Sequence, residues 1–486
     1  MRRLHLSTRL PTLFTVAVFL GSGLQIASAQ IGSSLPGAPV PSAEATSAAR
    51  QTANRTASLP GSSEPQTPSS ANATSPSGYA ASATSAADPR RRPTSRPGAL
   101  TLQQVVQVAR DKNPTLQAAA ETLRSVRAQE IQAGVRANPN LGLNGSNVSL
   151  PAQGAANPYA YAVQVSRLFE RGNKRQYRLQ DARATTAQTA AQLEDTTRQT
   201  TLLVKQAFTQ MLIAKAALEL SNANLKDYRH EVDIANDRYK AGDLGKLDFE
   251  RIDLQLGSFE ADHANAEINL IQASDQLQTF MGVDLPSKDF DIIGDIVPPV
   301  LRAAESDLVR TALLGRPDYL AARSGVTVAE AASRLAIANG TADPTLEGEY
   351  DRSGTYNSAG FNISVPIRLF DRNQGNKETA RLQANAARLT ELATRNQVVS
   401  DIDQAWVGYT RARALSDRFG EHYLDESSDV LTIARFAFDH GGLALIDYLD
   451  ALRDSRASTA DALNAYSQTW LAIHQLSAAS ASELTP

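Results

Sequence analysis

The chain has 486 residues, a formal net charge of −3 at pH 7, 42% hydrophobic residues and no cysteine. The near-neutral charge gives no support to nucleic-acid binding, and the absence of cysteine excludes disulfides and thiolate metal sites. We therefore expect stability to come from packing and oligomerisation.

The first 29 residues have the three-part pattern of a cleaved secretory signal. Two arginines at positions 2 and 3 precede an apolar stretch over about residues 10–20, and Ala-Ser-Ala ends at Ala29. The stretch is shorter than the roughly 20 residues that a spanning helix needs, and no later segment is as long and as free of charge. We expect residues 1–29 to be a signal peptide on an exported chain, which without cysteine has no acceptor for an N-terminal lipid anchor.

Residues 30–97 consist mainly of Ser, Ala, Thr, Pro and Gly, with few large apolar side chains. Such a segment buries too little surface to offset its ordering entropy, which predicts a disordered periplasmic tether. Its run Arg90-Arg91-Arg92, with Arg96, leaves open a contact with anionic lipid or peptidoglycan. The alternative is a solvated linker.

The rest of the chain contains the same motifs twice, about 200 residues apart. Asn113-Pro114 returns as Arg316-Pro317, Arg167-Leu168-Phe169 as Arg368-Leu369-Phe370, and Gly242-x-Leu244 as Gly441-x-Leu443. Because the motifs keep their order, they predict a duplicated unit that alternates short strands with very long helices. We place the first repeat at residues 98–285, a linker at 286–305, the second repeat at 306–482 and a tail at 483–486.

Short stretches of alternating apolar and polar residues precede each long helical region. They lie near residues 141–143 and 159–165 in the first repeat, and near 346–350 and 361–369 in the second. This alternation is typical of a membrane-spanning β-barrel, although a soluble sheet with one wet face has the same pattern. Because closed barrels need about eight strands, several chains would share one barrel, and three copies would supply twelve. Pro366 lacks an N–H and suits the end of a strand.

Helical patterns cover about residues 173–239 and 373–438, each followed by a second helix. Apolar and small residues recur every seven positions: Val204, Met211, Leu218, Leu225, Val232 and Tyr239 in the first repeat, and Ile402, Tyr409, Ser416, Tyr423 and Val430 in the second. Helices of this length extend on the order of 100 Å, which suits a duct that crosses the periplasm. A fibrous coiled coil is the alternative interpretation.

The two Gly-x-Leu turns interrupt these helical patterns and predict the tips of two helical hairpins, because glycine provides a left-handed turn. Just beyond the second tip, Asp447 and Asp450 lie three positions apart and so share a helix face. In a trimer around a pore they would form two rings of acids that attract cations. The alternative is solvated acids that favour a helix N-terminus. Asp248 is their lone counterpart in the first repeat.

Together these features resemble the TolC-type outer-membrane factors, from about residue 100 to the C-terminus. Residues 446–451 resemble the stretch that carries the family's gate aspartates, and residues 365–376 resemble the strand-to-helix corner of its cobalt-zinc-cadmium resistance branch. The resemblance implies a mainly α fold with a small membrane β part, in which a trimeric 12-stranded β-barrel continues into a long periplasmic α-helical barrel. It also implies a periplasmic gate at Asp447 and Asp450, and adaptor-docking tips at Gly242, Leu244, Gly441 and Leu443.

The sequence predicts no catalytic residue, cofactor or metal site, because its six histidines are scattered and it has no phosphate loop or nucleophile elbow. We expect a channel rather than an enzyme, in the bacterial outer membrane and extending into the periplasm. The predicted partners are two further copies of the chain, outer-membrane lipid, a periplasmic adaptor and an inner-membrane RND pump, with divalent heavy-metal cations as the exported substrate. A channel for drugs or for type I protein secretion, and a trimeric coiled-coil surface protein without a pore, are the alternatives.

Overall fold

The computed structural model describes residues 88–146 and 159–484. The predicted signal peptide and residues 30–87 of the predicted tether lie outside the described residues. The first repeat contains α1 (Leu102–Lys112), α2 (Pro114–Gly134), β1 (Asn140–Ser146), β2 (Ala160–Leu168), α3 (Lys174–Ala241) and α4 (Lys246–Phe280). The second contains α5 (Glu305–Gly315), α6 (Pro317–Ala338), β3 (Thr345–Ser353), β4 (Tyr356–Ser364), α7 (Gln374–Arg418), a π-helix (Phe419–Tyr423), α8 (Leu424–Asp439) and α9 (Leu445–Ser480).

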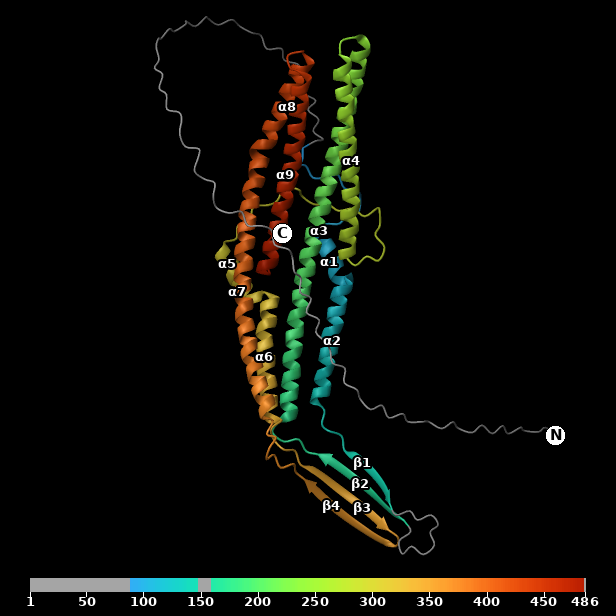
Figure 1. Ribbon diagram of the computed structural model, residues 1–486, viewed down its shortest axis with the longest axis vertical. Coiled ribbons are helices and arrows are strands. Elements are labelled where there is room, and N and C mark those ends of the chain that lie inside the picture. The colour runs from blue at the N-terminus through green and yellow to red at the C-terminus, as the bar shows by residue number, and fades with distance from the viewer. Residues whose placement is uncertain (1–87, 147–158, 485–486) are drawn as a thin grey trace, which may run out of the picture. The chain divides into compact units, whose positions relative to one another are not determined.

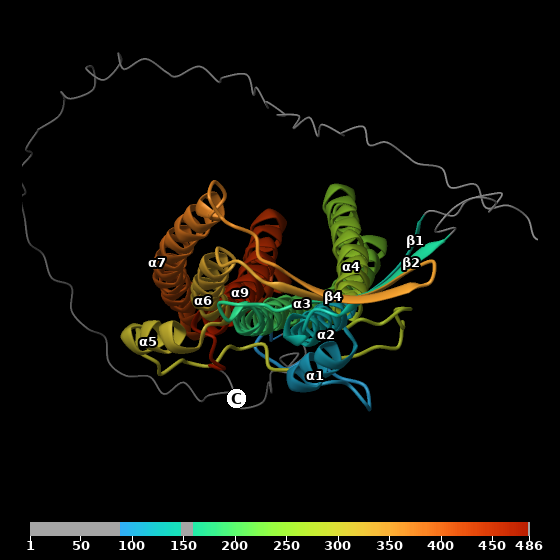
Figure 2. The ribbon, with the colours of Figure 1, turned by 90° about the horizontal axis from the view of Figure 1, so that it is seen from below.

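The same order of helices and strands therefore occurs twice, and the predicted mainly α fold with a small β part is confirmed (Figure 1). Within this part of the chain, the sheet lies at one end of the helices and the turns of the two hairpins, α3–α4 and α8–α9, lie at the other (Figure 1). Viewed from below, the equivalent helices α1 and α5 lie on the same side of the long helices (Figure 2). No helix in the described ranges combines the length and apolarity needed to cross a membrane.

The strands form one antiparallel sheet in the order β1-β2-β3-β4. The register pairs Leu141 with Val165, Val165 with Gly348 and Gly348 with Phe361, so these residues share one face. Strand β4 begins at Tyr356 and ends at Ser364, so the prediction that the strand continues to residue 369 is wrong. The ladder ends two residues before Pro366, which has no N–H to donate.

The long helix of the second repeat is interrupted, whereas that of the first is not. Helix α3 runs for 68 residues without a break. Its counterpart is divided into α7 (45 residues), the π-helix (5 residues) and α8 (16 residues). The uninterrupted helix predicted over residues 373–438 is therefore wrong, and a π-helix of one turn separates the hairpin α8–α9 from α7.

The π-helix also changes which residues of the heptad pattern are buried. In α3, the heptad residues Val204, Met211 and Leu225 are buried. In α7, Ile402, Tyr409 and Ser416 are likewise buried, but Tyr423 and Val430 beyond them are 41% and 54% exposed. A π turn holds more residues than an α turn, so it rotates the following residues around the helix axis. The heptad pattern therefore no longer predicts buried residues from the π-helix onward.

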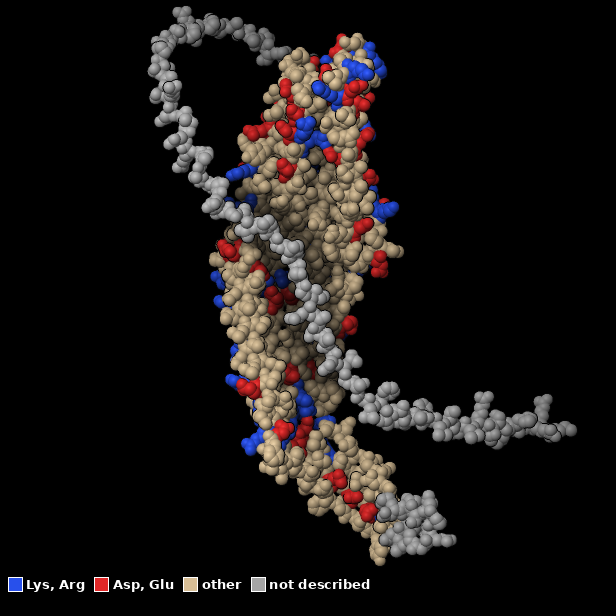
Figure 3. All heavy atoms as spheres, in the orientation of Figure 1, with Lys and Arg blue, Asp and Glu red and all other residues tan. Residues whose placement is uncertain are grey.

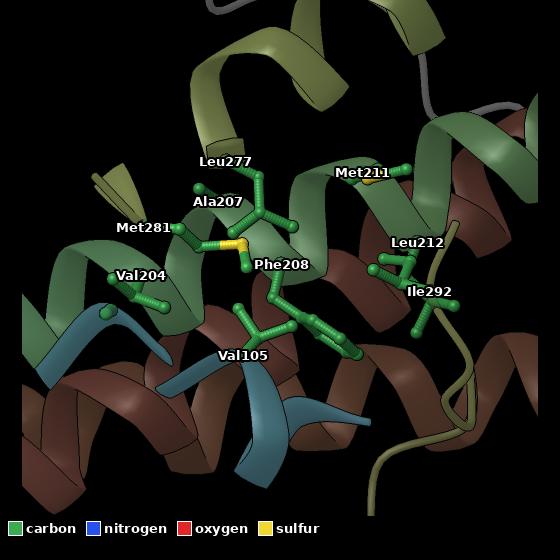
Figure 4. Close-up of a cluster of buried hydrophobic side chains, with 10 residues drawn as sticks. Val105, Val204, Ala207, Phe208, Met211, Leu212, Leu277, Met281 and Ile292 are labelled. Carbon is green, nitrogen blue, oxygen red and sulfur yellow. The ribbon is translucent and has the colours of Figure 1, made fainter. Parts of the chain in front are cut away.

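The best-buried part of the first repeat lies where α1, α3, the end of α4 and the following linker meet. Val105 of α1, Phe208 of α3, Leu277 of α4 and Ile292 of the linker belong to one apolar cluster (Figure 4). Val105, Leu277 and Ile292 are fully buried. Burial of such side chains contributes about 1.5–3 kcal/mol each, so this cluster anchors the linker and α1 on the long helix.

Residues 88–97, the part of the predicted tether that the structure describes, contact the helices and the linker through hydrogen bonds and ion pairs. We call these residues the strap. Three of its arginines form ion pairs elsewhere in the chain: Arg90 with Asp425, Arg92 with Asp295, and Arg96 with Asp289. Within the chain, these arginines therefore bind acidic side chains of the folded part, rather than only water or lipid.

Candidate functional site

The two hairpin tips share one architecture. Gly242 and Gly441 are exposed and have positive φ angles of 87° and 73°, a backbone conformation that glycine adopts without steric cost. Leu244 and Leu443 are half-buried and pack against an apolar cluster that both hairpins share. The four predicted tip residues therefore shape the two turns, and the leucines anchor them inward.

Aromatic pairs support both turns from within. Tyr239 stacks on Phe249 in the first hairpin and Phe438 stacks on Tyr448 in the second, with ring centroids 5.2 and 5.1 Å apart and the rings 6° from parallel in both. Burial raises the pKa of Tyr448 to about 12, so its phenol stays neutral. These pairs pack beneath each turn, and their matching positions extend the duplication to the tips.

Two residues besides the four predicted tip residues contribute exposed apolar surface at the tips. Leu247 is 61% exposed on the first turn of α4, and Ile446 is 50% exposed on the first turn of α9. They follow Gly242 and Gly441 at the same spacing, so the repeat itself was the signal that would have identified them. Together they offer a surface for a partner at the tips.

Asp447 and Asp450 are both exposed on one face of α9, as their spacing predicts. Asp447 lies in the first turn, where the helix dipole favours a carboxylate. Asp450 forms an ion pair with Arg453 at 2.6 Å, a contact that the spacing alone did not indicate. Asp454 and Asp461 are exposed on the same face further along the helix, so acidic groups follow α9 away from the tip.

Two ion pairs connect the hairpins to each other. Arg435 of α8 pairs with Glu231 of α3, and Arg456 of α9 pairs with Asp262 of α4. The Arg456 guanidinium also lies 3.9 Å from the centroid of the Phe259 ring. Any separation of the two hairpins must break these contacts. No local pattern indicates these ion pairs, because the partners are about 200 residues apart.

The two faces of the sheet differ sharply in polarity. On one face, Leu141, Leu143 and Phe361 are 69%, 72% and 81% exposed. On the other, Glu347 and Glu349 of β3 alternate with residues of the apolar face, and Asp351 continues the row. Acidic side chains follow the sheet in Figure 3. An exposed apolar face opposite an acidic face fits a sheet between lipid and water.

A cavity of about 420 Å³ lies beneath the strap, lined by Arg90 and Arg92, by Phe208 of α3, and by Trp470 and His474 of α9. His474 is 1% exposed, and its Nε2 is 3.0 Å from Thr209 Oγ1. Burial lowers the pKa of His474 to about 3, so the ring is neutral at physiological pH. A neutral, buried imidazole among apolar groups and arginines paired with acids does not resemble a catalytic centre.

Among the residues that the structure describes, no group of three or more histidine or acidic side chains is placed to hold a metal ion. The notable polar features are instead surfaces: the acidic face of the sheet, the acidic face of α9 and the two tips. Such an arrangement can guide ions along a path and dock a partner at its end.

The model for the family described as outer membrane efflux protein matches residues 105–283. The cobalt-zinc-cadmium resistance protein CzcC of Cupriavidus metallidurans is 25% identical over 363 residues, which are 74% of this chain and 85% of that protein. The probable outer membrane lipoprotein SilC of Salmonella typhimurium is 26% identical over 272 residues, which are 51% of this chain and 56% of that protein.

The solved structure of the CmeC outer membrane channel of Campylobacter jejuni is similar over 79% of this chain and 86% of its own, with a TM-score of 0.67 and 15% identity. At this identity the likeness shows the fold alone. The fold of this chain is therefore that of the solved outer-membrane channels. The family model ends at residue 283 and covers none of the second repeat.

Proposed function

This chain belongs to the family of TolC-type outer-membrane efflux factors, and from this premise we propose that it forms the exit channel of a tripartite system that exports divalent heavy-metal cations. As a member, it is an outer-membrane efflux channel that extends into the periplasm, and it is not an enzyme. The alternative of a surface coiled coil without a pore is set aside on the same grounds.

The working unit in this proposal is a homotrimer with one shared barrel. Strands β1 and β4 are the outer strands of the sheet, so their free edges are available to pair with β4 and β1 of neighbouring copies. Closure in this way puts the face of Leu143 and Phe361 toward lipid and the face of Glu349 toward water. The sheet with these two opposite faces is the observation that carries the proposal.

The gate in this proposal is the end of the duct formed by the tips. Asp447 and Asp450 of three chains lie there as rings of acids, and a periplasmic adaptor docks on the turns that Gly242 and Gly441 form. Opening then means that the hairpins move apart. Because the sequence contains no nucleotide-binding motif, the energy for export comes from an inner-membrane pump, which we assign to the RND class.

A cationic substrate is supported by the charge along this path. Glu347, Glu349 and Asp351 lie on the inner face of the proposed barrel, and the acidic face of α9 begins at the proposed gate. Rings of carboxylates attract cations and repel anions. The CzcC relative, which is 25% identical, is a cobalt-zinc-cadmium resistance protein. On this similarity we propose divalent metal cations as the substrate of this chain as well.

The gate is tested by replacing Asp447 and Asp450 together with alanine in the full chain. We expect a higher leak conductance in planar lipid bilayers and weaker block by multivalent cations, because the rings of negative charge are lost. Asp248→Ala, at the equivalent position in the first repeat, is the matched control. Unchanged conductance and block in the double variant would remove both aspartates from the gate.

The substrate is tested by growth of a strain that lacks this chain, with and without complementation, across graded cobalt, zinc, cadmium, nickel and copper and a drug panel. Sensitivity confined to divalent metals supports the proposal. Sensitivity to drugs alone would keep the channel and discard the metal assignment. A defect in secretion of a protein without either sensitivity would favour the type I secretion alternative.

A further inference from the structure

The strap connects the two repeats at the level of the π-helix. On the side of the first repeat, the backbone N–H of Thr94 donates to Glu219 Oε1 at 2.7 Å, and Lys215 Nζ donates to Ser95 Oγ at 3.1 Å. Both partners belong to α3. The strap is thus anchored on the uninterrupted long helix.

The linker after α4 adds a second anchor for the strap. The backbone N–H of Arg96 donates to Asp291 Oδ2 at 2.7 Å, and Lys215 also forms an ion pair with Asp291. Both side chains of that pair are nearly buried, at 10% and 12% exposed. Desolvation alone would raise the pKa of Asp291, but hydrogen bonds from Lys215 and from backbone N–H groups lower it below its ordinary value. The anchor therefore stays ionised and bonded at neutral pH.

At its other end, the strap reaches the second repeat through Arg90, among other contacts. Arg90 Nη1 donates to the carbonyl oxygen of Gly420 at 3.2 Å, and Arg90 Nη2 donates to Asp425 Oδ1 at 2.9 Å. Gly420 lies inside the π-helix, whereas Asp425 lies in the first turn of α8. One guanidinium therefore spans the junction between the π-helix and the helix that follows it.

The π-helix has the features of a hinge. Single π turns within α-helices are frequent sites of bending, because the backbone hydrogen-bond pattern changes there. Gly420 lies so close to α9 that a Cβ added to it would be 3.0 Å from Tyr466 Oη. The Tyr466 ring is buried, and its hydroxyl has no hydrogen-bond partner among the described residues. No hydrogen bond therefore fixes the π-helix to α9 at the contact between Gly420 and the Tyr466 hydroxyl.

We propose that the strap restrains the hairpin α8–α9, and that release of Arg90 from Gly420 and Asp425 allows α8 to pivot about residues 419–423. The strap is fixed on α3 and the linker, so α8 cannot rotate away from them while both Arg90 contacts persist. The effect of this restraint on gating rests on the proposed channel function. The restraint itself concerns the position of one hairpin and can be measured without a pore.

The first readout is the distance between the two tips. The chain has no cysteine, so L247C and I446C accept spin labels cleanly, and dilution with unlabelled chains limits the signal to pairs within one chain. We expect Arg90→Ala and Asp425→Asn to broaden the distance distribution. Arg381→Ala, which removes an exposed pair with Glu378 inside α7, is the matched control and should leave the distribution unchanged.

The second readout is conductance of the same variants in lipid bilayers. Loss of the Arg90 contacts removes the restraint and should raise the open fraction. The rise should be only about three- to tenfold, because the Arg90 ion pair is partly exposed and therefore contributes little free energy. In R90C/D425C chains, a reversible bis-thiosulfonate linker should lower the open fraction, and a reductant should restore it. Broader tip distances together with these changes would establish the restraint.

The outcomes separate the two ideas. Tip distances that stay the same in both variants and under the linker would overturn the restraint, whatever the conductance. Tip distances that broaden in chains without any conductance would support the restraint and contradict the channel. Should Arg90→Ala fail to fold, Asp425→Asn leaves the strap sequence intact and decides the same question.

Discussion

The contacts of Arg456 make the sharpest prediction about opening, because they join α9 to α4. The Arg456 side chain is 20% exposed and that of its partner Asp262 is 56% exposed, so we discount the ion pair to about 1 kcal/mol. The guanidinium over Phe259 adds about 1 kcal/mol. Burial lowers the pKa of Arg456, and this desolvation cost opposes both attractions.

Arg456→Ala should therefore weaken the coupling between the hairpins by about 1 to 2 kcal/mol, which corresponds to about a 5- to 30-fold rise in the open-to-closed ratio. The assay is single-channel recording of the full chain in planar bilayers. Arg229→Ala, which removes an exposed pair with Glu260 inside the first hairpin, is the matched control and should change the ratio little.

A double-mutant cycle with Asp262→Asn separates the two contributions of Arg456. If the ion pair matters, the effects of the single variants will not add, and the coupling energy will be about 1 kcal/mol. Additive effects would assign the whole change to the contact with Phe259. Equal open fractions for Arg456→Ala and the Arg229→Ala control would refute the reasoning that separation of the hairpins opens the pore.

Two further predictions concern the sheet and the buried histidine. Replacing Glu347, Glu349 and Asp351 together by the corresponding amides should lower the cation-over-anion permeability ratio about two- to fivefold. The ratio is measured as a reversal potential across a salt gradient, with Glu378→Gln on α7 as the control. An unchanged ratio would place these acids away from the ion path. For His474, the pKa in the folded chain is about 3, below the ordinary value of 6.5, so the unfolded chain binds the proton more readily and stability falls as the pH drops below about 6.5. Between pH 7 and pH 5 the loss is about 2 kcal/mol. This loss should lower the midpoint of thermal unfolding as the pH falls, and the midpoint of His474→Gln should depend much less on pH. Equal pH dependence in the two proteins would contradict the burial argument.

The parts of the fold that depend on local sequence were predictable. Helices commonly end at a glycine in the left-handed conformation, so Gly242 and Gly441 marked both tips. Alternation of apolar and polar residues marked all four strands, because the two faces of the sheet have different surroundings. Pro366 marked the end of a strand, although the ladder stops two residues earlier.

Features that depend on contacts between distant segments were not predictable. The strap has the composition of a linker, and only the folded chain reveals that Arg90 lies beside Asp425. The π-helix escaped detection because the heptad spacing continues through Tyr423 and Val430 in the sequence. A heptad pattern records only spacing along the chain, whereas burial depends on the angle around the helix, which one π turn changes.

The two repeats differ at the positions on which the proposed gate depends. The first has a continuous α3, and Arg251 occupies the position equivalent to Asp450, within 4.0 Å of Asp248. The second has a π-helix behind its hairpin and carries Asp447 and Asp450 at its tip. The two hairpins are similar because they come from a duplicated unit, but the π-helix and the paired acids both occur in the second one. The hairpin α8–α9 is therefore the one we expect to move, with α3–α4 as the fixed support against which Arg456 and the strap hold it.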